Sequence, residues 1–107
     1  MKNLYLKASE FDTYIIKREE ENDFDVHTAK YENGVQYVFQ FENGYGASVI
    51  KRPCSYGGNE DLWELAVLKF YSNGEYHLNY DTEITEDVEG YLTDEDVHEL
   101  LKRIKNL

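Results

Sequence analysis

The chain has 107 residues, 41% of them hydrophobic and 15% aromatic, which is too apolar for a disordered segment and sufficient for one domain with its own core. Asp and Glu number 22 against 11 Lys and Arg, so the formal net charge is −11. Nucleic acid and anionic membrane surfaces would repel this charge, so direct binding to either is disfavoured. A basic protein partner is favoured instead, including one that itself binds nucleic acid.

The cysteine content and the N-terminus bear on the compartment. Cys54 is the single cysteine, which excludes an intramolecular disulfide and favours a reducing compartment. The sequence has no run of 18 apolar residues, and its first residues lack the apolar stretch and cleavage site of a signal peptide. We therefore expect a cytoplasmic protein.

Residues 1–24 leave the local structure open. Tyr14, Ile15 and Ile16 fit either a strand or a short helix, and the acidic run 19–21 resembles a solvated turn. From residue 25 to residue 80, apolar alternation predicts a largely antiparallel meander of about five strands. These strands are expected at residues 25–32, 35–41, 45–52, 62–71 and 76–80.

Asn-Gly pairs and apolar patterning supply the detail of this meander. Asn and Gly tolerate positive φ, so type I′ hairpin turns are expected at residues 33–34, 43–44 and 73–74. The run at 62–71 is apolar on both faces for most of its length, as a central strand would be. One face of the second strand is expected to carry Val35, Tyr37, Phe39 and Phe41.

An amphipathic helix is predicted at residues 93–106, after an acidic loop at residues 81–92. Thr93 is a suitable N-cap, and Asp96 three residues later completes a short capping box. An apolar stripe is expected from Val97, Leu100, Leu101 and Ile104. The predicted fold is therefore a single α+β domain, 1–107, with the C-terminal helix packed on one face of the sheet.

The sequence offers no catalytic, cofactor-binding or metal-binding motif. Its three histidines lie far apart outside any paired motif, and Cys54 has no second cysteine with which to bind zinc. The glycine-containing segment 44–49 lacks the third glycine of a dinucleotide fingerprint. Residues 85–90 approach a calcium loop but lack the carboxylate at its first position. We expect a protein that is not an enzyme and needs no cofactor.

The stretch 81–99 carries nine carboxylates and no Lys or Arg. It is either a solvated loop that leads into a capped helix or a docking face for a basic partner. Tyr56, in a flexible Tyr-Gly-Gly loop, would add an aromatic anchor to such a face. The predicted face consists of Asp81, Glu83, Glu86, Asp87, Glu89, Asp94 and Glu95.

Four segments in order carry a resemblance to known sequences: Asn-Gly-Tyr-Gly-Ala-Ser-Val-Ile at 43–50, Tyr-Gly-Gly at 56–58, Leu-Trp-Glu-Leu-Ala-Val-Leu at 62–68, and the acidic segment 80–93. Together they resemble small uncharacterised acidic proteins encoded by bacteriophages and prophages, with the match covering about residues 43–107. The resemblance supplies no site residues. It implies a phage accessory protein made in the cytoplasm of a bacterial host cell.

These observations favour a non-enzymatic phage accessory protein that binds and modulates a host or phage protein. By analogy, it would be a charge-based inhibitor that imitates DNA, presenting carboxylates where a partner expects phosphates. One alternative is a virion, assembly or homo-oligomeric structural protein. Another is a small-ligand-binding module that uses the Tyr-rich loops.

Overall fold

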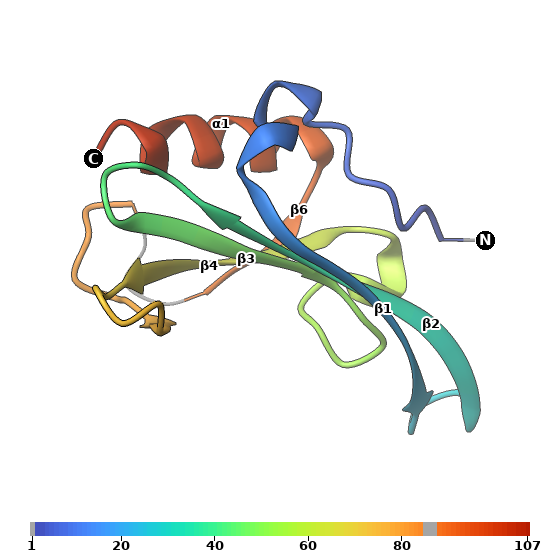
Figure 1. Ribbon diagram of the computed structural model, residues 1–107. Helices are drawn as coiled ribbons and strands as arrows, with labels where there is room; N and C mark the ends of the chain where they lie inside the picture. Colours follow the sequence, from blue (N-terminus) through green and yellow to red (C-terminus); the bar gives the residue numbers. More distant parts are fainter. Residues whose placement is uncertain (1, 85–87) are drawn as a thin grey trace.

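The computed structural model describes residues 2–84 and 88–107 (Figure 1). Glu86 and Asp87 of the predicted docking face lie outside the described residues. The elements follow in chain order: 3-10 helix η1 (Ser9–Tyr14), strand β1 (Ile15–Asp25), β2 (Lys30–Gln40), β3 (Tyr45–Lys51), 3-10 helix η2 (Gly58–Glu60), β4 (Trp63–Phe70), β5 (Tyr76–Leu78), β6 (Glu89–Leu92) and helix α1 (Asp94–Lys105).

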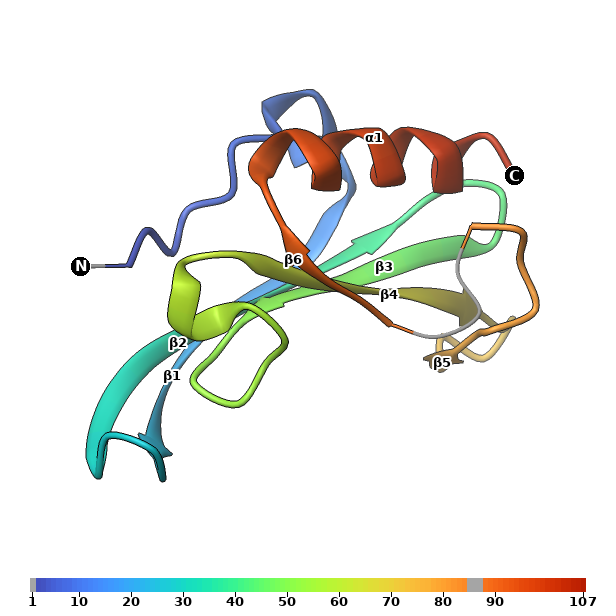
Figure 2. The ribbon, with the colours of Figure 1, turned by 180° about the vertical axis from the view of Figure 1, so that it is seen from behind.

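The strands form one antiparallel sheet in the order β1-β2-β3-β4-β5, so the predicted meander and the α+β class are confirmed. Strand β4 is central, as its apolar sequence indicates: β3 pairs along one edge, and β5 and β6 pair with successive parts of the other. Helix α1 lies across one face of the sheet, and the β1–β2 hairpin extends away from it (Figures 1 and 2). No helix of the described residues is long and apolar enough to cross a bilayer.

The core lies between α1 and the sheet. The predicted inward side chains are 5% exposed or less: Val35, Tyr37 and Phe39 in β2, and Phe41 directly after its end. From the helix, Val97, Leu101 and Ile104 are fully buried in the same cluster, and Leu100 is partly buried against it. Burying each such side chain contributes about 1.5–3 kcal/mol, which fixes the helix on this face.

Both ends of α1 are held by side chains. The Thr93 hydroxyl accepts a hydrogen bond from the Asp96 amide (3.1 Å), and the Asp96 carboxylate accepts one from the Thr93 amide (3.0 Å), which confirms the capping box. At the other end, the Asn43 side chain donates to the carbonyls of Ile104 (2.8 Å) and Lys105 (3.1 Å). The β2–β3 turn therefore also caps the C-terminal end of the helix.

Two of the three Asn-Gly pairs lie in hairpin turns, but not in turns of the expected type. Gly44 and Gly74 have φ values of 86° and 87°, whereas neither preceding Asn has a positive φ. Each Asn side chain instead accepts a hydrogen bond from the backbone amide two residues later, at 3.0 Å. The type I′ prediction was wrong because each Asn, held by this side-chain hydrogen bond, does not have the positive φ that a type I′ turn requires. Only the Gly of each pair lies in the left-handed region.

The hairpin predicted at residues 33–34 was wrong, and so was the strand predicted at 25–32. Asn33 and Gly34 both lie inside β2. The chain turns instead between Asp25 and Lys30, where Ala29 has a φ of 56°. Strand β1 occupies 11 residues that include the acidic run 19–21, so that run is not a turn. Gly34 serves a close approach, since a Cβ there would lie 2.8 Å from the Arg52 side chain.

Candidate docking face around strand β6

Strand β6 lies within the segment predicted as an acidic loop, and it contains a bulge. Glu89 is opposite Leu65 and Leu92 is opposite Trp63, so β6 has one more residue than β4 between these pairs. At the bulge, Tyr91 has a φ of 57° and the residue is 58% exposed. The left-handed region costs a bulky residue about 1–2 kcal/mol, and such outliers cluster at functional positions.

Tyr56 lies directly against this bulge. Its carbonyl accepts a hydrogen bond from the Tyr91 amide (3.1 Å), and its own amide donates to the Glu64 carboxylate (3.0 Å). A Cβ on Gly90 would lie 2.4 Å from the Tyr56 Cβ, so only glycine allows this approach. The Tyr56 residue is 59% exposed. The structure therefore brings the predicted aromatic anchor together with the predicted acidic segment.

A shallow cleft of about 290 Å³ opens beside Tyr91. It lies between the β1–β2 turn, the loop that precedes and includes η2, and the bulge of β6. Its lining residues are His27, Pro53, Cys54, Ser55, Gly57, Asn59, Glu60 and Tyr91. The cleft gives an approaching side chain a contact surface next to the two exposed tyrosines.

Among the described residues, the predicted carboxylates do not form one cluster. Glu89 is exposed on β6 and Glu95 is exposed in the first turn of α1, while Asp81 and Glu83 are exposed in the loop that follows β5. Figure 2 shows β6 running between that loop and the start of α1. The exposed carboxylates therefore lie towards both ends of β6 and at its first residue, Glu89. We call Tyr56, Glu64 and Tyr91 the β6 face.

Asp94 has a structural role that the sequence did not reveal. Its carboxylate accepts hydrogen bonds from the indole N–H of Trp63 (2.9 Å) and from the Lys7 amide (3.3 Å), and the residue is half-buried. It ties the start of α1 to β4 and to the N-terminal segment. Asp94 therefore contributes to the fold rather than presenting a free carboxylate to a partner.

The buried Lys51 side chain is the centre of a polar cluster beside this contact. It is 3% exposed, its ammonium donates to the Asp61 carboxylate (2.8 Å) and to the Asn3 carbonyl (2.7 Å), and it lies 4.2 Å from the centre of the Trp63 ring. Burial alone would raise the pKa of Asp61, but the hydrogen bonds from Lys51 and from the Asn3 amide outweigh it and lower that pKa. The cluster fastens the N-terminus to the body of the fold.

The lowered pKa of Asp61 predicts a component of acid sensitivity. A group whose folded pKa is depressed stabilises the fold above its unfolded pKa of about 3.9, and this contribution disappears as the pH falls through the folded pKa. We expect Asp61→Asn to flatten the decline in the free energy of unfolding below about pH 4. Urea titrations over a pH series would check this, and parallel declines in the wild type and the variant would contradict it.

The histidines and the cysteine are spread over the described residues, with His27 and Cys54 both lining the cleft beside Tyr91. His98 is paired with Glu10 (2.7 Å), His77 lies 3.8 Å from Glu75, and Cys54 is exposed. Within residues 2–84 and 88–107, no three His, Cys, Asp or Glu side chains are grouped so as to hold a metal ion.

Sequence reasoning missed Tyr91 and Glu64 as members of the β6 face. The available signal was Gly90-Tyr91-Leu92, in which glycine followed by an aromatic and an apolar residue is typical of a bulged strand. No family model, curated protein or solved structure matches the chain.

Proposed function

We propose that this chain is a non-enzymatic binding protein that docks on a basic protein partner through the β6 face and modulates that partner. The main support is Tyr91, an exposed residue held in a costly left-handed conformation beside a second exposed tyrosine, in a chain of net charge −11. Aromatic anchors supply binding energy at interface centres, and surrounding charges steer the encounter. The flanking carboxylates would face Lys or Arg side chains.

The resemblance to phage-encoded proteins suggests the setting of this activity. In that setting the partner is a host or phage protein in the bacterial cytoplasm, and a nucleic-acid-binding protein has the complementary charge. Carboxylates along β6 would then occupy positions that such a partner uses for phosphates. This imitation of DNA is the most specific form of the proposal.

Tyr91→Gly tests whether the Tyr91 side chain is needed for binding the partner and not for the stability of the fold. Glycine relieves the left-handed strain, so we expect the free energy of unfolding to stay unchanged or to rise by up to about 1 kcal/mol. Retention of the partner should nevertheless fall at least about tenfold, which corresponds to one lost aromatic anchor. Urea unfolding measures the first effect, and quantitative affinity capture from bacterial lysate measures the second.

Tyr71→Ala is the matched control, because Tyr71 is 51% exposed and lies in the β4–β5 turn, away from β6. It should leave retention of the partner unchanged. Equal retention by Tyr91→Gly and the wild type would remove the β6 face from the proposal. Capture of only this chain or of virion proteins would favour an assembly role instead.

A further inference from the structure

Residues 2–7 are bound to the rest of the molecule in the way an extended peptide is bound by a receptor. In the described structure, their backbone makes no hydrogen bond to the backbone of a strand. Side chains from the rest of the molecule form hydrogen bonds with this backbone instead. The Asp61 carboxylate accepts from the Asn3 amide (2.8 Å), and the Lys51 ammonium donates to the Asn3 carbonyl (2.7 Å).

The same pattern continues along the segment. The Leu4 carbonyl accepts from the Arg18 guanidinium (3.2 Å) and from the Tyr37 hydroxyl (3.3 Å). That hydroxyl in turn accepts from the Leu6 amide (3.2 Å). The Lys7 amide donates to the Asp94 carboxylate, as described above. These contacts all recognise the main chain, which every extended peptide shares.

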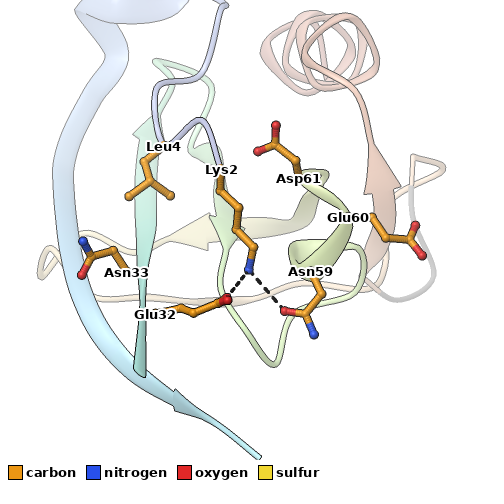
Figure 3. A pocket seen from close by; sticks show the side chains of 7 residues that line it. All are labelled: Lys2, Leu4, Glu32, Asn33, Asn59, Glu60 and Asp61. Carbon is orange, nitrogen blue, oxygen red and sulfur yellow. Dashed lines mark hydrogen bonds and ion pairs between the residues drawn. The ribbon is translucent and has the colours of Figure 1, made fainter. Parts of the chain in front are cut away.

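Side chains of the segment occupy sites that would give selectivity. The Lys2 ammonium points into a cleft of about 670 Å³, where it donates to Glu32 (2.7 Å) and to the Asn59 side chain (3.2 Å), as Figure 3 shows. The cleft lining also includes Glu60 and Asp61, so it is acidic. Two and four residues later, Leu4 and Leu6 are partly buried against the core.

We propose that this is a binding site for an extended segment of another protein, one that carries a lysine followed by apolar residues two and four positions later. The chain's own residues 2–7 occupy the site in the structure and show which ligand fits it. The Glu32 carboxylate pairs with the Lys2 ammonium and Glu60 also lines the cleft, whereas Asp61 is already paired with Lys51, so Glu32 and Glu60 make the cleft complementary to a basic ligand. This site is distinct from the β6 face, so it stands even if the β6 face binds nothing.

The tethered segment competes with any ligand because a short connection gives it a millimolar effective concentration. A test must therefore weaken the segment while leaving its site intact. The full-length double variant Lys2→Glu, Leu4→Ala does so, since it repels the segment from Glu32 and removes one apolar contact. A fluorescent peptide with the sequence of residues 2–8 (Lys-Asn-Leu-Tyr-Leu-Lys-Ala) is the probe, read by anisotropy.

The double variant should bind the peptide saturably, and the wild type should bind it at least about tenfold more weakly. Far-UV circular dichroism and cooperative unfolding establish that the variant is folded. A folded variant that binds no peptide would overturn the proposal. So would a dimer that excludes the peptide, because the occupant would then be the N-terminal segment of a second copy.

A charge exchange makes the test independent of the double variant. Glu32→Lys keeps both leucines and should bind a peptide with Glu in place of its first Lys more tightly than the original peptide. Combining Glu32→Lys with Lys2→Glu in the chain should restore the internal contact and exclude both peptides. Binding that ignores the sign of the first residue would refute the assigned role of the cleft.

Discussion

Replacing Trp63 by alanine is expected to lower the free energy of unfolding by about 3–5 kcal/mol. Trp63 is 1% exposed and is the largest fully buried side chain. Its ring packs edge-on against Tyr37 at 5.9 Å and lies beneath the Lys51 ammonium, while its N–H binds Asp94. Alanine would leave a cavity and remove a neighbour from each of these three residues. Urea unfolding followed by far-UV circular dichroism measures the loss.

Trp63→Phe separates the contributions. Phenylalanine keeps an aromatic ring under Lys51 but removes the hydrogen bond to Asp94, so we expect a smaller loss of about 1–3 kcal/mol. The Lys7 amide remains as a donor to the Asp94 carboxylate. A loss below about 1 kcal/mol for Trp63→Ala would show that the junction of β4, α1 and the N-terminal segment does not depend on this residue.

Gly46→Ala is expected to cost about 3 kcal/mol, an unusually large effect for a single methyl group. A Cβ at Gly46 would lie 1.9 Å from the backbone carbonyl oxygen of Phe39 and 2.7 Å from the Phe70 ring. The carbonyl belongs to β2, which pairs with β3 over six residue pairs, so relief requires displacement of the sheet itself. Thermal and urea unfolding of the purified variant would measure the cost.

Gly74→Ala is the matched control for this prediction. Gly74 has a φ of 87°, but no atom of the described residues would lie within 4 Å of a Cβ at this position. Its substitution isolates the cost of the left-handed backbone, about 1–2 kcal/mol. A smaller loss for Gly46→Ala than for Gly74→Ala would mean that β3 adjusts readily and that the close approach at Gly46 has little energetic consequence.

Local sequence signals predicted the fold correctly where the structure of an element depends only on residues that are neighbours in the sequence. Thr93 and Asp96 marked the start of α1 because the capping box needs only four neighbouring residues. The alternation from Val35 to Phe41 predicted the buried face of β2 for the same reason. The sheet order followed, because short connections favour antiparallel neighbours.

The failures occurred where a distant partner decided the structure. Asn33-Gly34 has the chemistry of a turn, but pairing with β1 and the approach of Arg52 place it inside a strand. The run 19–21 lacks apolar residues, and only its pairing with β2 makes it a strand. Such tertiary contacts override local propensity and leave no signal in a window of ten residues.

The candidate site was predictable in composition but not in arrangement. The sequence indicated an acidic stretch and one aromatic anchor, Tyr56, and the structure places that anchor against β6. It could not indicate that Tyr91 joins Tyr56, because the contact depends on a bulge and on a hydrogen bond across 35 residues of chain. The sequence also did not distinguish Asp94, whose carboxylate accepts a hydrogen bond from Trp63, from carboxylates that remain free to contact a partner.

The salt dependence of partner binding tests the central proposal most directly. The tagged wild-type chain would be used for affinity capture from bacterial lysate, with washes at about 0.05 M and about 0.5 M salt, where screening lengths differ about threefold. We predict a basic, nucleic-acid-handling partner that is retained at low salt and lost at high salt, with Tyr91→Gly reducing its retention. Retention that ignores both the salt concentration and Tyr91 would contradict a charge-driven binding protein.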